Sequence, residues 1–81
     1  MRIKGREYIE ESLGAGMVRV RLITKPDGYH VDVNRARLRA WVNGTGYIQD
    51  MLPELNADQR EFLMSGADPE EFERLFGKED Q

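Results

Sequence analysis

Apolar and polar residues alternate through residues 17–33, and this pattern predicts a β-hairpin. Val18 and Val20 stand at every second position before the turn, and Val31 and Val33 do so after it. A period of two is typical of strands that bury one face. Between the two runs lies the sequence Lys-Pro-Asp-Gly, which suits a type I turn or a slightly longer loop. We therefore expect two antiparallel strands joined by this turn.

After the hairpin, the spacing of apolar residues changes to that of a helix. Asn34 is a favoured N-cap, and Val33 before it has the spacing of a hydrophobic staple with Leu38. Asn43 and Gly44 provide the end of this helix. The residues expected to face inward are Leu38, Trp41 and Val42.

Further short helices are expected after residue 46. The first ends before Pro53, because proline cannot continue a helix. The next is capped by Asn56, has Gln59 in place for a capping box, and ends at Gly66. Asp68 is the expected N-cap of the last. Much of the core is expected from Tyr47, Ile48, Met51, Leu52, Leu55, Phe62 and Leu63, with Phe72, Leu75 and Phe76 buried by the last helix.

The N-terminal segment allows two interpretations. The opening Met-Arg-Ile-Lys alternates and can pair as a short strand. Over residues 6–13, Tyr8, Ile9 and Leu13 have helical spacing, and Gly14 stands where a glycine would end a helix. We favour a helix over 6–13, with an extended strand as the alternative.

Together these segments predict an α+β fold. An antiparallel hairpin at about 17–33, with a third strand from the N-terminus as an option, packs against three to four short helices. The 81 residues suffice for a single small globular domain, which we place at 1–77. Residues 78–81 are expected to form a frayed acidic tail.

The net charge of −3 conceals a division between the two halves of the chain. Residues 1–40 hold nine Lys or Arg against five acids, whereas residues 41–81 hold three against ten. An asymmetry of this size suggests that the halves present different faces to different partners, or to each other.

Part of the second half also follows an order of residues seen in a known group of proteins. Residues 33–77 resemble small uncharacterised open reading frames of tailed phages and related mobile elements, which share an IQxxxPxL…REFLxSG helical block. The resemblance implies a phage or prophage origin and a short accessory role, with no known activity and no functional residues to carry over. The matching residues are Ile48, Gln49, Pro53, Leu55, Arg60, Glu61, Phe62, Leu63, Ser65 and Gly66.

Candidate chemistry is sparse. The chain has no cysteine, which excludes disulfides and thiolate metal sites. Its one histidine, His30, lies on a predicted strand with no set of ligands or nucleophile near it in sequence, so we expect a surface residue. We therefore expect no enzyme, no metal and no cofactor. No apolar run is long enough to span a bilayer, and the N-terminus is unlike a signal peptide, which favours the cytoplasm. The resemblance to phage open reading frames implies that this is the cytoplasm of a bacterial host.

Two charged surfaces remain as candidate binding sites. The first is an acidic helical face that would dock a basic region of a protein, including a groove that normally holds nucleic acid. The second is an arginine patch on the hairpin and first helix, which would neutralise phosphates of nucleic acid. The acidic face comprises Asp50, Glu54, Asp58, Asp68, Glu70 and Glu73, and the arginine patch comprises Arg19, Arg21, Arg35 and Arg39.

The first surface leads to the favoured function, a phage-derived accessory protein that binds a host or phage protein and inhibits machinery that handles nucleic acid. The second leads to the alternative, a nucleic-acid-binding protein. Association of copies through complementary basic and acidic halves is a further option. The residues do not name the partner or the host.

Overall fold

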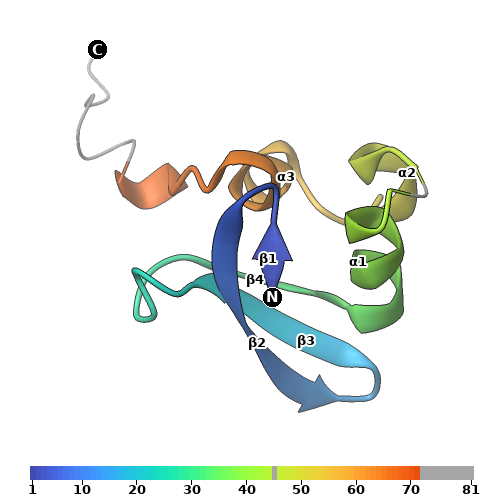
Figure 1. Ribbon diagram of the computed structural model, residues 1–81, viewed down its shortest axis with the longest axis horizontal. Coiled ribbons are helices and arrows are strands. Elements are labelled where there is room, and N and C mark those ends of the chain that lie inside the picture. The colour runs from blue at the N-terminus through green and yellow to red at the C-terminus, as the bar shows by residue number, and fades with distance from the viewer. Residues whose placement is uncertain (45, 72–81) are drawn as a thin grey trace.

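A computed structural model describes residues 1–44 and 46–71 of the chain. It contains a four-stranded antiparallel sheet in the order β1-β2-β3-β4 (Figure 1). The α+β fold is therefore as expected, and the optional N-terminal strand is present. The strands are β1 (Arg2–Ile3), β2 (Arg6–Gly14), β3 (Met17–Leu22) and β4 (His30–Asn34).

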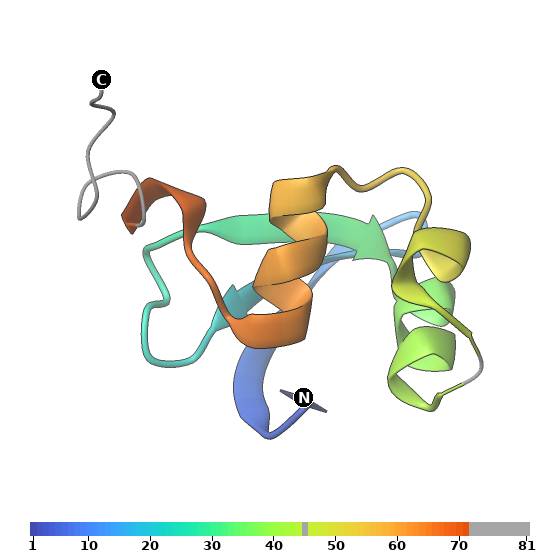
Figure 2. The same ribbon diagram turned by 90° about the horizontal axis from the view of Figure 1, so that it is seen from above.

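Short helices follow the sheet in the chain. Figures 1 and 2 show α3 lying over the sheet, while α1 and α2 lie together at one end of it. A helical turn at 69–71 follows α3, and the remainder of the predicted fourth helix, with Phe72, Leu75 and Phe76, lies outside the described residues. The predicted tail at 78–81 lies outside them as well. The helices are α1 (Arg35–Val42), α2 (Ile48–Met51) and α3 (Ala57–Ser65).

The helix favoured for residues 6–13 is wrong, because this segment is strand β2. It pairs with β3 along most of its length, with Tyr8 opposite Leu22 and Glu10 opposite Val20. Gly14 does not end a helix. It adopts a left-handed backbone with φ 84° and leads into the turn that joins β2 to β3. The pairing of β2 with a strong neighbouring strand outweighs the weak helical spacing of its apolar residues.

The predicted caps are present in the structure. The side chain of Asn34 accepts a hydrogen bond from the backbone N–H of Arg37, which starts α1. At the start of α3, Asn56 and Gln59 form a complete capping box. Gly66 ends α3 in the left-handed conformation, with φ 78°. These caps satisfy backbone groups that a helix end leaves free.

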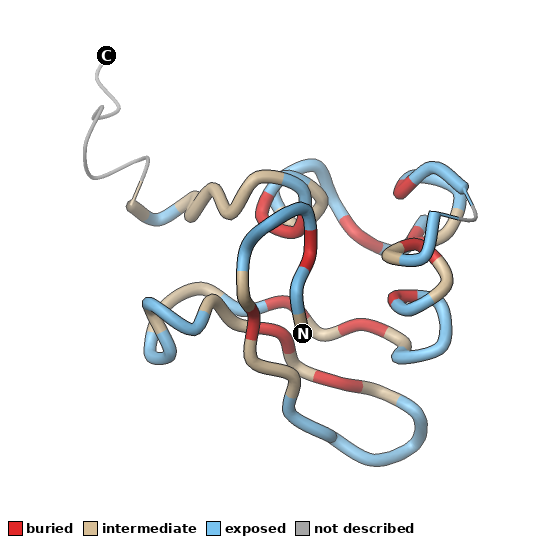
Figure 3. The backbone as a smooth tube through the Cα atoms, viewed as in Figure 1, coloured by how far each residue is buried: buried red, intermediate tan, exposed pale blue. Residues whose placement is uncertain are grey.

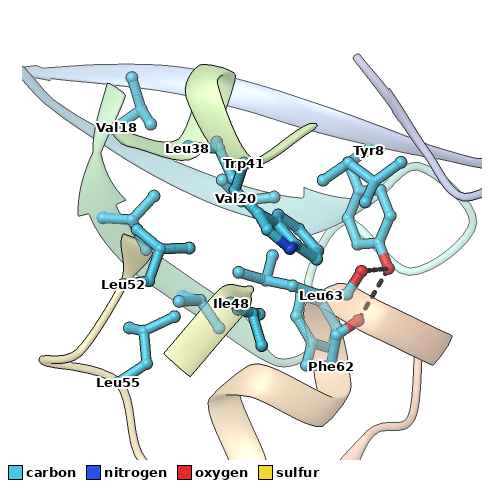
Figure 4. Packing of buried hydrophobic residues seen from close by; sticks show 13 residues of the cluster. Tyr8, Val18, Val20, Leu38, Trp41, Ile48, Leu52, Leu55, Phe62 and Leu63 are labelled. Atoms are coloured by element: carbon cyan, nitrogen blue, oxygen red, sulfur yellow. Dashed lines mark hydrogen bonds between the residues drawn. The ribbon is translucent and has the colours of Figure 1, made fainter. Parts of the chain in front are cut away.

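Buried hydrophobic residues from the sheet and from α1, α2 and α3 form one cluster (Figures 3 and 4). Val33 and Leu38 are both fully buried, as the predicted staple requires. One predicted core residue is wrong: Tyr47 is 75% exposed, because it is the N-cap of α2 and precedes the helix. The buried residues are Ile3, Tyr8, Val18, Val20, Val31, Val33, Leu38, Trp41, Ile48, Leu52, Leu55, Phe62 and Leu63.

Strand β2 contacts the C-terminal end of α3, and this contact joins the sheet to the helix. The hydroxyl of Tyr8 donates to the backbone carbonyl of Phe62 at 2.7 Å and lies 3.4 Å from that of Leu63 (Figure 4). The side chain of Arg6 lies against Gly66. A Cβ atom added at Gly66 would lie 2.7 Å from the Cδ atom of Arg6. Strand β2 thus supplies a hydroxyl and a cation to the helix terminus that carries partial negative charge.

Candidate binding surfaces

The arginine patch predicted from the sequence is divided between the two faces of the sheet. Side chains alternate along β3, so the buried Val20 places its neighbours Arg19 and Arg21 on the open face. Arg35 and Arg39 lie on α1, whose Leu38 and Trp41 pack into the core on the covered face. The predicted union of these four arginines into one patch is therefore wrong.

On the open face, arginines are paired with carboxylates. The guanidinium of Arg19 donates two hydrogen bonds to Asp32, its cross-strand neighbour, at 2.8 and 3.1 Å. These bonds hold the pKa of the Asp32 carboxyl below its usual value, against a smaller opposing effect of burial. Arg21 lies 3.4 Å from Glu11 on β2. The positive charges of Arg19 and Arg21 are consequently balanced by carboxylates of the same chain.

The Arg19–Asp32 pair predicts a loss of stability in acid. Because the folded state lowers the pKa of Asp32, its contribution to stability is complete above about pH 4 and declines as the pH falls through the lower folded-state pKa. We expect Arg19→Gln to raise the pKa of Asp32, measured by NMR titration of its carboxyl carbon. An unchanged pKa in the variant would contradict the assigned cause.

Glu10 is a partner of the predicted arginine patch that the sequence did not indicate. It stands on the covered face of β2, opposite Val20, and its side chain is only 15% exposed. One carboxylate oxygen accepts a hydrogen bond from Arg39 at 3.0 Å, and the other lies 3.6 Å from Arg35. Glu10 therefore links α1 to the sheet. A helix over residues 6–13 gave no reason to place this carboxylate beside α1.

Glu10 and its neighbour Glu11 form a matched pair for a stability test. We expect Glu10→Gln to lower the free energy of unfolding by about 1–2 kcal/mol, because it removes a mostly buried charge that faces two arginines. Glu11→Gln should cost about 0–1 kcal/mol, because Glu11 is 53% exposed and has one loose partner. Urea unfolding measures both values. Equal costs would show that Glu10 does not link α1 to the sheet.

The predicted acidic face has members on and after α2 and on and after α3. Glu54, which follows α2, lies 4.0 Å from Arg37 of α1, and Asp50 lies within α2. Asp58 lies on α3, and Asp68 and Glu70 follow it in the chain. Glu73 lies outside the described residues.

The negative charges of Asp58, Asp68 and Glu70 act on Tyr29, just before β4. Burial chiefly raises the pKa of the Tyr29 phenol, and the negative charges of these three carboxylates raise it further. Asp68 also accepts hydrogen bonds from backbone N–H groups of the turn at 69–71, as an N-cap does, and lies over the β3–β4 loop at Gly28. An ion pair between Lys25 of that loop and Glu71 joins the same two segments. These contacts hold Asp68, and the turn that carries Glu70, over the β3–β4 loop. None of the three carboxylates has an ion-pair partner within residues 1–44 and 46–71.

Ion pairs thus leave a surplus of negative charge in the second half of the chain. Among residues 1–44 and 46–71, the side chains of Lys4, Arg6 and Arg60 are the cations outside ion pairs, and Lys4 lies 5.9 Å from the centre of the Trp41 ring. The carboxylates outside ion pairs in the same ranges are Asp27, Asp50, Asp58, Glu61, Asp68 and Glu70.

His30 is exposed, as expected, on the open face of the sheet and opposite Arg21. The two residues line a shallow depression of about 210 Å³ together with Pro26, Asp27 and Gly28 of the β3–β4 loop. Within the described part of the chain, no three His, Asp or Glu side chains come together in a way that could hold a metal ion. The helices in that part are too short and too polar to cross a membrane.

Comparison with protein-family models, with curated proteins and with solved structures finds no match to this chain.

Proposed function

We propose that this protein is a non-enzymatic binding protein whose acidic surface engages a basic region of a partner protein. The acidic surface is defined here by Asp50, Glu54, Asp58, Asp68 and Glu70, with Glu73 as a further predicted member. The observation that carries the proposal is an imbalance in ion pairing. Six of the seven arginines of residues 1–40 lie within ion-pair distance of a carboxylate, whereas four of these five carboxylates have no ion pair within residues 1–44 and 46–71. Such a surface attracts a positively charged partner and favours its correct orientation.

The resemblance of residues 33–77 to phage open reading frames supports an accessory role in a phage or its bacterial host. A basic region that normally binds nucleic acid is a natural counterpart for an acidic surface. We therefore propose that the protein acts in the bacterial cytoplasm and inhibits machinery that handles nucleic acid, by occupying such a region.

The nucleic-acid alternative has less support. Arg19, Arg21, Arg35 and Arg39 each lie within ion-pair distance of a carboxylate, and they are divided between two faces. Phosphate binding would have to compete with these internal pairs, and the neighbouring carboxylates would repel the phosphate backbone.

Capture from a bacterial lysate with the immobilised protein tests the proposal. We expect a basic protein that elutes as salt rises, because ions screen exposed charges. The double variant Asp58→Lys with Glu70→Lys should reduce its capture by about tenfold or more, as expected when like charges face each other. The matched control, Glu79→Lys with Asp80→Lys, changes the net charge equally and should retain it. Capture of nucleic acid that is lost on Arg19→Gln, and not on the acidic reversal, would favour the alternative.

A further inference from the structure

Within residues 1–44 and 46–71, strand β4 has β3 as its one neighbouring strand. The hydrogen-bond register shows which backbone groups of β4 bond to β3. The N–H of Arg35 donates to the carbonyl of Gly16 at 2.9 Å, and these residues continue the β3–β4 register by one pair. In an antiparallel ladder, pairs that exchange hydrogen bonds alternate with pairs that do not. Val33 and Val31, two and four residues before Arg35, therefore point their backbone groups toward β3.

The residues between these valines point their backbone groups the opposite way. The N–H and C=O of His30 and Asp32 face the free edge of β4. Hydrogen bonds from these groups to any other part of residues 1–44 and 46–71 are absent. The sheet order places β4 at the edge, and Figure 2 shows it at the outer side of the sheet, under α3. Unpaired donors and acceptors in this arrangement are a template for another strand.

Contacts of the β4 side chains hold the backbone of this edge in its extended conformation before any partner binds. Val31 and Val33 are fixed in the core, and Asp32 is held by two hydrogen bonds from Arg19. A partner strand would therefore not have to order the edge before binding to it, which lowers the entropic cost of association.

Negative charge near the start of β4 favours an added strand that carries positive charge. The beginning of β4 follows Gly28 and Tyr29 directly. The carboxylate of Asp68 lies against Gly28, and the negative charges of Asp58, Asp68 and Glu70 act on Tyr29. None of the three has a cationic partner in the described part of the chain. Lysine or arginine side chains of an added strand would be attracted to this end of the edge.

We propose that β4 binds an extended, basic segment of the partner protein as a fifth strand of the sheet. This rests on the proposed function and specifies the form in which the partner binds. Main-chain hydrogen bonds to His30 and Asp32 supply affinity, and the carboxylates near Tyr29 favour a basic sequence. A second copy of this chain is a poorer occupant, because its own β4 carries Asp32 and no lysine or arginine.

Hydrogen exchange of backbone amides, followed by NMR with a short capped peptide of alternating lysine and threonine, tests this proposal. The amides of His30 and Asp32 should exchange more slowly when the peptide is bound. The amides of Val31 and Val33 already bond to β3 and serve as internal controls, so their exchange should change little. Protection confined to the outward amides is the signature of an added strand.

Two control peptides separate backbone pairing from charge. Methylating alternate backbone nitrogens on the edge-facing side removes donors and keeps every charge, and we expect it to weaken binding by about tenfold or more through the lost hydrogen bonds. Replacing lysine by glutamate keeps the donors and reverses the charge, and it should weaken binding to a similar extent.

The outcomes distinguish this proposal from the proposed function. If the methylated lysine peptide binds as well as the parent and His30 and Asp32 stay unprotected, the strand proposal is overturned while an acidic binding surface stands. If the glutamate peptide binds equally, the choice of a basic occupant is overturned. Protection of both amides that rises with protein concentration in the absence of peptide would identify a second copy and overturn the proposal.

Discussion

Replacing Phe62 by alanine is expected to lower the free energy of unfolding by about 3–5 kcal/mol. Phe62 is 1% exposed and lies between two tyrosine rings, with ring centroids 5.6 Å from Tyr8 and 5.1 Å from Tyr29. Its removal leaves a cavity where β2, the β3–β4 loop and α3 meet, and it abolishes both edge-to-face contacts. A protein of this size has a total stability of roughly 4–12 kcal/mol, so a large part of the variant is expected to be unfolded on warming.

Met64 provides the matched control on the same helix. It is 39% exposed, and Met64→Ala should cost less than about 1 kcal/mol. Circular dichroism and the fluorescence of Trp41, the one tryptophan of the chain, measure both variants in urea. A similar small cost for Phe62→Ala would mean that α3 is not held to the sheet through this side chain.

Replacing Tyr8 is expected to have the second large effect. Tyr8→Ala should cost about 3–5 kcal/mol, because Tyr8 is 2% exposed and packs against Phe62. Tyr8→Phe retains the ring and removes the hydroxyl that donates to the Phe62 carbonyl, so it should cost about 1–1.5 kcal/mol. This carbonyl also accepts from the N–H of Gly66 and therefore keeps a partner in the Phe variant. A cost near zero for Tyr8→Phe would show that the hydroxyl bond adds nothing to folding.

The same residue predicts a response to alkali. Burial raises the pKa of the Tyr8 phenol, and the nearby Arg6 opposes this in part. The contribution of the neutral phenol to stability is complete below about pH 10 and is lost as the pH rises toward the higher folded-state pKa. Tyr8→Phe should flatten this decline without abolishing it, because the pKa of Tyr29 is raised too. Urea unfolding at a series of pH values above 9 measures the slope, and an equal slope in the variant would contradict the assignment.

The parts of the fold that could be predicted from the sequence are those governed by short-range rules. The hairpin follows from alternation on both sides of one turn, and the caps at Asn34, Asn56 and Gly66 depend on residues within three or four positions. Each of these interactions is formed by neighbours in the chain, so the spacing of residue types suffices to place it.

Strand β2 could not be assigned in this way, because its conformation depends on a pairing that the segment alone does not encode. Glu10 stands among buried valines on the covered face, where alternation would call for an apolar residue. That carboxylate is balanced by arginines of α1, about 29 residues further along the chain. The prediction that Tyr47 is a core residue was wrong for a different reason. Tyr47 lies one residue before α2, and a shift of one residue at a helix boundary separates a buried core residue from an exposed N-cap.

The candidate surfaces also depend on contacts between residues that are distant in the sequence. Charge counts identified which half of the chain carries arginine, yet they did not indicate that Arg19 pairs with Asp32 or that Arg39 pairs with Glu10. Those pairs depend on strand register and on how α1 packs, and they determine which charges remain for a partner. For the acidic surface, the sequence likewise did not indicate that the charges of Asp58, Asp68 and Glu70 act on Tyr29.

The contact between Tyr8 and Phe62 has a consequence for the order of folding. It joins residues 54 positions apart, whereas β2, β3 and β4 pair through successive hairpins. Closing the longer loop costs more chain entropy, so the hairpins are expected to form first and α3 to dock late. Substitutions at this junction would then act mainly by accelerating unfolding, with little change in the folding rate. The junction would thus set how long the native state persists more than how quickly it is reached.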